Sequence, residues 1–179
     1  MANVFAFAES RNGELRKIAL EAVTAARAVA DATGGQVHAF VAGATGIENC
    51  APQLAKYGAD EVVVAEHASF AKYNPEAVAA IVAERVRTGG YRVAIFPTSA
   101  LGSDLAPRVA AKLGVGLVTD VTEIKLEGDA VIVKHPVNIG KVLATVKIAS
   151  NPALVAIRAN MFTPVESPHA GTIQRAAPV

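Results

Sequence analysis

Residues 92–113 indicate how this chain folds, and they read Arg-Val-Ala-Ile-Phe-Pro-Thr-Ser-Ala-Leu-Gly-Ser-Asp-Leu-Ala-Pro-Arg-Val-Ala-Ala-Lys-Leu. The apolar run Arg92–Phe96 is typical of a strand that is buried on both faces. Beyond the polar loop 97–103, Leu105, Val109 and Leu113 recur at a spacing of four residues. This spacing predicts a helix over 104–113, capped by Ser103 or Asp104. The segment is therefore one strand–loop–helix unit.

The same unit recurs three times before this segment. Helix 14–33 is closed by a pair of glycines, and Pro75 stands in the first turn of helix 75–87, where proline is favoured. Strands and helices that alternate in this way form a parallel sheet covered by helices on both faces. We predict a three-layer, doubly wound, Rossmann-like α/β fold, with strands at 3–8, 37–42 and 61–65 and helices at 14–33, 47–57 and 75–87.

The pattern changes after residue 115. Strand-like runs follow one another at 121–126, 130–134, 141–148 and 154–158, and no helical period separates them. Short turns such as Glu127-Gly128-Asp129 join antiparallel neighbours, so we expect these four strands to form an antiparallel β extension. Residues 167–179 are rich in proline and alanine without an apolar period, which favours a linker or tail.

Composition excludes several classes of protein. The 179 residues carry a net charge of +1 and are 52% hydrophobic, which describes one globular domain. There is no basic run for nucleic acid or for an anionic membrane, and no apolar run reaches the roughly 18 residues of a membrane span. The apolar run that follows Met1, residues 2–8, is too short for the hydrophobic region of a signal peptide and has no basic flank. We expect the chain to start as written, without nucleic acid or membrane partners, in the cytoplasm or a mitochondrial matrix.

The sequence offers no conventional catalytic or metal motif. Dinucleotide-binding and phosphate-loop glycine patterns are absent, as are Cys-x-x-Cys, His-Glu-x-x-His and Gly-x-Ser-x-Gly. The four histidines have no paired spacing, so we assign no metal ligand and no catalytic residue. Cys50 is alone and precedes Leu54 by four residues on a predicted helix, which favours a buried structural thiol.

Two loops follow the carboxyl ends of predicted parallel strands, where open α/β sheets bind ligands. The first contains Glu9 and Ser10. The second contains Thr98, Ser99, Gly102 and Ser103, and its helix N-terminus could receive an anion. Asp104 argues against a phosphate there, because a carboxylate in the first turn already satisfies the helix dipole. These residues are candidates for a ligand-binding site or for an interface.

Three stretches, matching in order and spacing, resemble the alpha subunit of electron-transfer flavoprotein. They are Ala8-Glu-Ser-Arg-Asn-Gly-Glu-Leu-Arg-Lys17, Leu54-Ala-Lys-Tyr-Gly-Ala-Asp60 and Asp104-Leu-Ala-Pro-Arg-Val-Ala-Ala-Lys-Leu-Gly-Val-Gly-Leu-Val-Thr-Asp-Val121. Residues 139–146 and 157–162 look like the closing segments of that family's first domain. We therefore expect a family-like N-terminal domain over 3–165 and a linker or tail over 166–179.

The resemblance implies a fold like that of the adenine-nucleotide alpha hydrolases and a function in electron transport. In that family the alpha subunit pairs with a beta subunit and passes electrons from acyl-CoA or other dehydrogenases to a quinone reductase or another acceptor. FAD lies mainly in a second alpha domain, whose motifs this sequence lacks. We therefore expect a non-enzymatic scaffold without FAD of its own, and a homo-oligomer in isolation. Two rivals stay open, namely a stand-alone nucleotide-binding α/β protein and a hydrolase or transferase.

Overall fold

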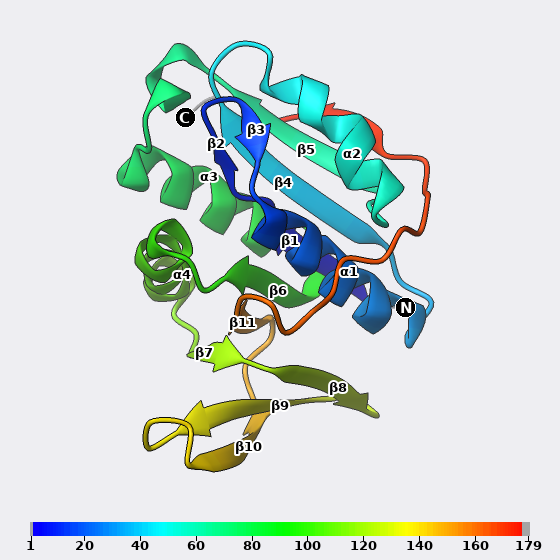
Figure 1. The fold of residues 1–179 in the computed structure, drawn as a ribbon, viewed down its shortest axis with the longest axis vertical. Helices are drawn as coiled ribbons and strands as arrows, with labels where there is room; N and C mark the ends of the chain where they lie inside the picture. The colour runs from blue at the N-terminus through cyan, green and yellow to red at the C-terminus, as the bar shows by residue number, and fades with distance from the viewer. Residues whose placement is uncertain (1, 177–179) are drawn as a thin grey trace.

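A computed structural model describes residues 2–176, and its main feature is a seven-stranded parallel sheet (Figure 1). The strand order is β12-β5-β4-β1-β6-β11-β7. The strands are β1 (Asn3–Phe7), β4 (Val37–Gly43), β5 (Glu61–Glu66), β6 (Tyr91–Pro97), β7 (Leu117–Val121), β11 (Ala153–Ile157) and β12 (Thr172–Arg175). The central strands are buried apolar runs, as strands covered on both faces must be.

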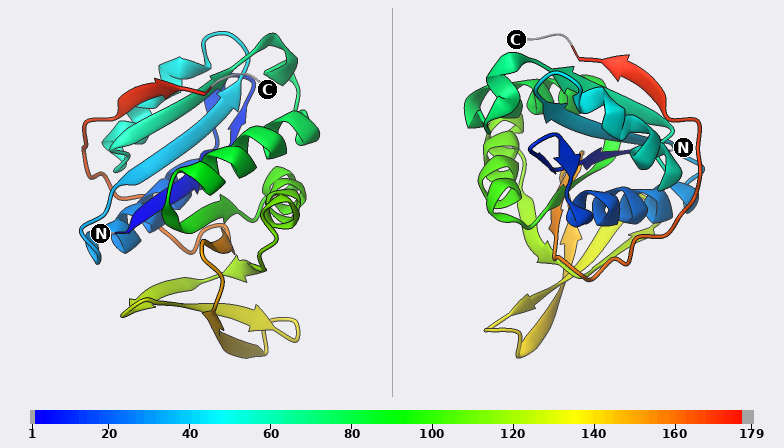
Figure 2. Two further views of the ribbon diagram at one scale, coloured as in Figure 1. Left: turned by 180° about the vertical axis from the view of Figure 1, so that it is seen from behind. Right: turned by 45° about the horizontal axis from the view of Figure 1, so that its top comes forward.

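Helices cover both faces of this sheet (Figure 2). One face packs against α1 (Lys17–Asp31) and α2 (Ala51–Lys56), which follows the 3-10 turn η1 (Ile47–Cys50). The other face packs against α3 (Pro75–Thr88) and α4 (Ala100–Leu113), and a second 3-10 turn, η2 (Ala68–Ala71), precedes α3. The predicted three-layer, mainly parallel α/β fold is confirmed.

A small antiparallel sheet projects from the side of the main body, as Figures 1 and 2 both show. It consists of β8 (Glu123–Glu127), β9 (Ala130–Val137) and β10 (Val142–Ile148), in the order β10-β9-β8. Val131, Val133 and Ile148 are buried at its base, where they join the core under α1. The predicted antiparallel extension is thus present.

The prediction that residues 154–158 belong to this extension was wrong. Strand β11 lies in the main sheet, parallel to both β6 and β7. All five of its residues are buried. A continuous apolar run of this kind indicates a strand covered on both faces, as it did for β1. The predicted strand 121–126 is likewise divided, because β7 joins the main sheet and β8 the antiparallel one.

The first part of the segment expected as a linker or tail over 166–179, residues 166–176, packs on the domain, whereas 177–179 lie outside the described residues. The chain passes over α1 and α2, where the Val165 amide donates to the Thr24 hydroxyl and the Ser167 amide to the Lys56 carbonyl. It then forms β12, a parallel edge strand on β5 whose four side chains are exposed. Backbone hydrogen bonds hold this strand while its side chains face solvent, so its sequence has no apolar pattern that would predict a strand.

The first helix begins later than its apolar period suggests. Residues 10–15 form a small hairpin of β2 (Ser10–Arg11) and β3 (Glu14–Leu15) before α1 starts at Lys17. The hairpin turns at Asn12 and Gly13, which both have positive φ angles, of 54° and 82°. An Asn-Gly pair favours this type of turn. The predicted helix start at Glu14 was therefore wrong, because Glu14 and Leu15 form strand β3 and the helix begins at Lys17.

Candidate functional site

The strand order places a topological switch point between β1 and β6. Strands β4, β5 and β12 lie on one side of β1, and β6, β11 and β7 lie on the other. At such a point the loops at the carboxyl ends of the two central strands separate and leave a crevice, which is where open α/β sheets bind ligands. In this protein the two loops contain Glu9 and the segment Thr98–Ser99, two of the regions chosen from the sequence.

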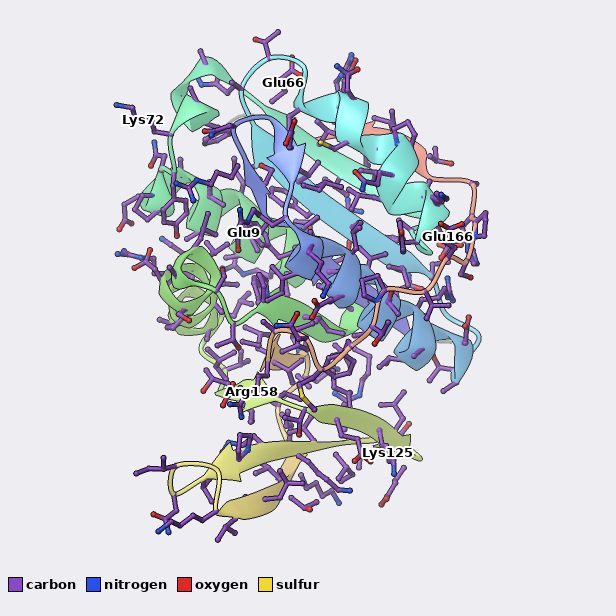
Figure 3. The ribbon with its side chains drawn as sticks, in the orientation of Figure 1. Glu9, Glu66, Lys72, Lys125, Arg158 and Glu166 are labelled. Carbon is purple, nitrogen blue, oxygen red and sulfur yellow. The ribbon has the colours of Figure 1, made fainter. Side chains whose placement is uncertain are left out.

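Glu9 and Ser99 meet at this crevice (Figure 3 labels Glu9). Glu9 is only 8% exposed, and its carboxylate accepts a hydrogen bond from the Ser99 hydroxyl. The Ser99 oxygen in turn accepts from the Gly102 amide, 2.9 Å away, as the N-cap of α4. A buried negative charge is thereby connected to the N-terminus of a helix, where the helix dipole favours it.

The start of α4 fits closely against the end of β6. A Cβ atom at Gly102 would lie 1.9 Å from the Pro97 carbonyl oxygen, so only glycine permits this approach. The Thr98 amide donates to the Ile157 carbonyl, which ties the loop to β11. The Thr98 hydroxyl is buried and has no hydrogen-bond partner among residues 2–176. The loop between β6 and α4 is therefore held close against the ends of β6 and β11.

The predicted cap of α4 at Ser103 or Asp104 was wrong. Helix α4 starts one turn earlier, and Ser103 is an exposed residue inside it. The prediction followed the apolar period that begins at Leu105, whereas the Ser99 hydroxyl caps the helix at the Gly102 amide, ahead of that period. Asp104 points instead to Arg108 and to the Tyr73 hydroxyl, 2.8 Å away. These hydrogen bonds, that from Arg108 first, lower the pKa of Asp104.

Ser10 has a local role in the structure. Its hydroxyl donates to the Ala42 carbonyl at 2.8 Å, which fixes the β2–β3 hairpin to the end of β4. The structure thus brings Glu9, Ser99 and Gly102 together, while the Ser10 hydroxyl bonds to β4 and Ser103 faces solvent. What the sequence did not reveal was that the carboxylate beside the helix N-terminus is Glu9, 90 residues from Ser99.

A phosphate does not fit this crevice. The Ser99 hydroxyl already caps the Gly102 amide in the first turn of α4, and the buried Glu9 carboxylate would repel a second anion in a site shielded from water. The pyrophosphate of FAD or the phosphate of AMP would meet the same charge. The arrangement holds two loops and a helix together, and the residues present do not suit a nucleotide's anionic part.

A second polar cluster lies at the opposite end of the sheet and was not foreseen. Arg85 on α3 donates to Glu61 and to the Tyr91 hydroxyl, and it reaches Gln174 of β12 at 2.7 Å. His38 Nδ1 lies 2.9 Å from the Tyr91 oxygen and 3.1 Å from Arg85. Burial lowers the pKa of His38, and the neighbouring Arg85 acts in the same direction although Glu61 opposes it. The cluster links five elements, α3, β4, β5, β6 and β12, and is structural.

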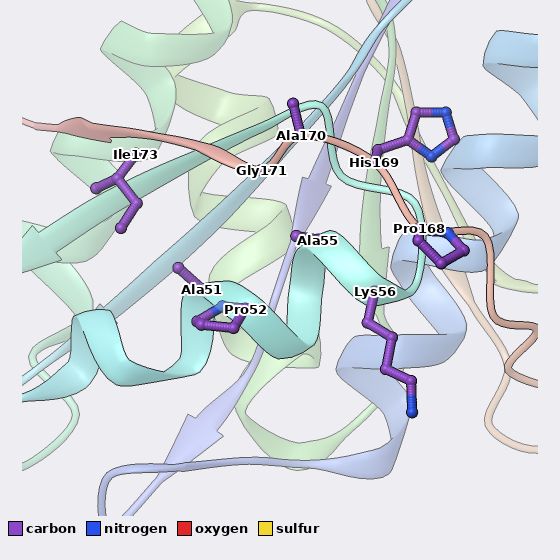
Figure 4. A pocket seen from close by; sticks show the side chains of 9 residues that line it. All are labelled: Ala51, Pro52, Ala55, Lys56, Pro168, His169, Ala170, Gly171 and Ile173. Atoms are coloured by element: carbon purple, nitrogen blue, oxygen red, sulfur yellow. The ribbon is translucent and has the colours of Figure 1, made fainter.

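Figure 4 shows a groove of about 410 Å³ where the C-terminal segment crosses α2. Small side chains line most of it, and Gly171 lies so close to α2 that a Cβ atom there would be 2.3 Å from that of Ala55. At one end Lys56 forms a 2.8 Å ion pair with Glu166, which raises the pKa of the lysine. The groove is a seam between two packed segments.

Within residues 2–176 no three His, Cys, Asp or Glu side chains come together as metal ligands would. No helix in the same range is long and apolar enough to cross a membrane. Cys50 is buried, with its Sγ 3.4 Å from the Gly13 carbonyl oxygen, and burial raises the pKa of its thiol.

Comparison with known proteins gives consistent matches. The family described as "Electron transfer flavoprotein domain" matches residues 4–179. The chain is 33% identical over 177 residues to the electron transfer flavoprotein subunit alpha of Syntrophomonas wolfei, covering 99% of this chain and 54% of that protein. The Bacillus subtilis protein of the same name is 31% identical over 88% of this chain and 47% of its own length.

A further relative has a different name. The acryloyl-CoA reductase electron transfer subunit beta of Anaerotignum propionicum is 30% identical over 70% of this chain and 34% of its own length. The chain thus spans about half the length of the curated alpha subunits that it matches. Their names describe subunits of electron-transfer proteins, in agreement with the resemblance seen in the sequence motifs.

Proposed function

Because the chain belongs to the electron transfer flavoprotein family, we propose that it is the first domain of an alpha-type subunit and serves as a scaffold. The observation that carries this proposal is the extent of the match, which covers 99% of this chain but only 54% of an alpha subunit. In the proposed division, residues 3–165 form the domain and 166–179 are a terminal segment, whose described part, 166–176, crosses α2 and pairs with β5. The flavin domain then lies outside these residues.

In this proposal the assembled protein accepts electrons from acyl-CoA or other dehydrogenases and passes them to a quinone reductase or another acceptor. Bound FAD supplies the redox chemistry, because no amino-acid side chain of this domain can carry it. The residues of this chain pack against a beta subunit and support the flavin domain. We assign no catalytic residue, and we propose a location in the cytoplasm or, in a eukaryote, the mitochondrial matrix.

The switch-point geometry supports a scaffold over a stand-alone nucleotide-binding protein. A nucleotide site there would need free helix amides and no competing negative charge, whereas the Ser99 hydroxyl already caps the Gly102 amide and donates to the Glu9 carboxylate. We propose that Glu9, Ser10, Thr98, Ser99, Gly102 and Ser103 serve internal contacts or an interface rather than ligand binding. The hydrolase or transferase alternative is disfavoured, because the Ser99 hydroxyl, although hydrogen-bonded to the Glu9 carboxylate, also caps the Gly102 amide, and that carboxylate is only 8% exposed.

Co-expression with an electron-transfer flavoprotein beta subunit from the same organism tests the proposal. We expect the two chains to elute together in gel filtration, and we expect the isolated chain to be colourless and to self-associate through its antiparallel sheet. Equilibrium dialysis with AMP and FAD should detect no tight binding to the isolated chain. Stoichiometric yellow flavin or micromolar AMP binding, with no beta-subunit complex, would establish the nucleotide-binding alternative instead.

A further inference from the structure

Strand β12 is attached to the main sheet chiefly through its backbone. It is the outermost strand of the sheet (Figure 2), and it pairs in parallel with β5 from Thr172 to Arg175. All four of its side chains are exposed, so separation of β12 from β5 would expose little apolar surface. A segment held by solvent-exposed backbone hydrogen bonds and few apolar contacts opens at a lower free energy than the rest of a domain. The side-chain contacts of β12 therefore decide how firmly it is held.

Two side chains of β12 bond to other elements, and the two contacts differ in kind. Arg175 pairs with Glu48 of η1 at 2.6 Å, but its side chain is 75% exposed, and such surface ion pairs contribute little to stability. Gln174 instead accepts a hydrogen bond from Nη1 of Arg85 on α3, at 2.7 Å. The Arg85 side chain is only 20% exposed. Gln174 is therefore the side chain that ties β12 to a partly buried group of the domain.

The same guanidinium determines the protonation state of His38. Arg85 Nε donates to the Tyr91 hydroxyl at 2.8 Å, and Arg85 Nη2 lies 3.1 Å from His38 Nδ1. The Tyr91 oxygen is 2.9 Å from the same nitrogen. A guanidinium has only donors, and the Tyr91 oxygen already accepts from Nε, which leaves the hydroxyl proton to point at Nδ1. His38 Nδ1 is therefore an acceptor, and the imidazole is neutral in this arrangement.

A protonated His38 does not fit these contacts. Its Nδ1 proton would face two donors, and its charge would lie 3.1 Å from the guanidinium of Arg85. Glu61 Oε1 is 3.7 Å from Nδ1, but this carboxylate already accepts from Arg85. Asp60, the other carboxylate whose charge acts on His38, is held by Arg27 at 2.7 Å. Burial lowers the pKa of His38, with Glu61 opposing and Arg85 reinforcing this effect. The imidazolium can therefore gain Glu61 only by displacing Arg85.

We propose that His38 and Arg85 form a pH-sensitive latch on β12. While His38 is neutral, Arg85 stays in place and holds Gln174. When His38 takes up a proton, Glu61 turns to the imidazolium, Arg85 is displaced and β12 separates from β5. Separation leaves the backbone of β5 as a free edge of the sheet, able to pair with another strand. The latch lies within this chain and does not depend on the proposed function.

A second histidine lies near the same segment and acts in the opposite direction. His169 Nε2 is 3.9 Å from Asp60 Oδ1, so protonation of His169 would strengthen its attraction to Asp60 and hold the chain ahead of β12 more firmly. Carboxylates ordinarily titrate at about pH 4, below the range in which a histidine does. A release of β12 between about pH 7 and pH 5 therefore points to His38.

Hydrogen–deuterium exchange of the backbone amides in this chain tests the latch. The protection of residues 172–176, corrected for intrinsic exchange rates, should fall about tenfold from about pH 7.5 to about pH 5.0. His38→Asn keeps an accepting oxygen near the place of Nδ1 but does not titrate, so it should abolish the fall. Gln174→Ala should abolish it too, and should raise the pKa of His38 measured by NMR, because linkage is reciprocal. Arg175→Ala is the matched control on the same strand, and should lower protection equally at both pH values.

Every other outcome counts against the latch. Equal protection of β12 at both pH values would overturn it, as would a fall that persists in His38→Asn or in Gln174→Ala. The second variant decides if His38→Asn does not fold, because the Gln174 side chain is exposed and its replacement leaves the core intact. The core strand β4 is the reference for global unfolding. If β12 is never less protected than β4, the strand opens only with the whole domain and the latch is ruled out.

Discussion

Replacing Ser99 by alanine should destabilise the protein more than a surface serine would. The hydroxyl caps α4 by accepting from the Gly102 amide, and it also donates to the carboxylate of Glu9, which is 8% exposed. Loss of an N-cap costs about 1 kcal/mol. A buried carboxylate left without its donor costs about 1–3 kcal/mol more. We therefore expect Ser99→Ala to lower the free energy of unfolding by about 2–4 kcal/mol.

Ser103→Ala is the matched control, because Ser103 lies in the same helix and is exposed. Its expected effect is within about 0.5 kcal/mol. Glu9→Gln keeps an oxygen that accepts from Ser99 but loses the charge at the helix N-terminus, and should cost about 1 kcal/mol. Urea denaturation followed by circular dichroism measures all three. Equal effects of Ser99→Ala and Ser103→Ala would refute the linked Glu9–Ser99 cap.

Three further predictions concern other parts of the fold. Because burial lowers the pKa of His38 below its unfolded value of 6.5, stability should fall as the pH drops through 6.5, and His38→Gln should reduce this loss in melting curves recorded from pH 8 to 5. Cys50 should react with Ellman's reagent slowly in the native protein and rapidly in urea, because burial raises the pKa of its thiol; equal rates would contradict this. Gly102→Ala should cost about 1–3 kcal/mol in chemical denaturation, since the new Cβ would collide with Pro97, whereas Gly116→Ala, where nothing lies within 4 Å, should be nearly neutral.

Local sequence patterns were sufficient for most of the elements. Buried strands such as β1 and β6 appear as continuous apolar runs, and α1 and α3 appear as apolar positions three and four apart. Both signals depend only on which side of an element faces the core. Several family motifs in the right order then indicated the family, and the chain spans about half the length of the alpha subunits that it matches.

The sequence was less informative where pairing depends on distant backbone. Strand β12 has four exposed side chains and is held by hydrogen bonds to β5, more than 100 residues away, so side-chain pattern could not reveal it. The assignment of β11 to the parallel sheet was missed for a related reason. No helical period precedes β11, which suggested an antiparallel neighbour, although the strand's own continuous apolar run indicates burial on both faces.

The sequence by itself determined the α/β class, the antiparallel extension, the family and the loops at the carboxyl edge of the sheet. Only the tertiary structure decided what those loops do. It placed the Glu9 carboxylate on the Ser99 hydroxyl, and it left Ile139 exposed at the turn of the β9–β10 hairpin. The physical reason is that secondary structure follows from periodicity over neighbouring residues, whereas a charge at a helix end or a side chain without a packing partner is defined by groups far apart in the chain.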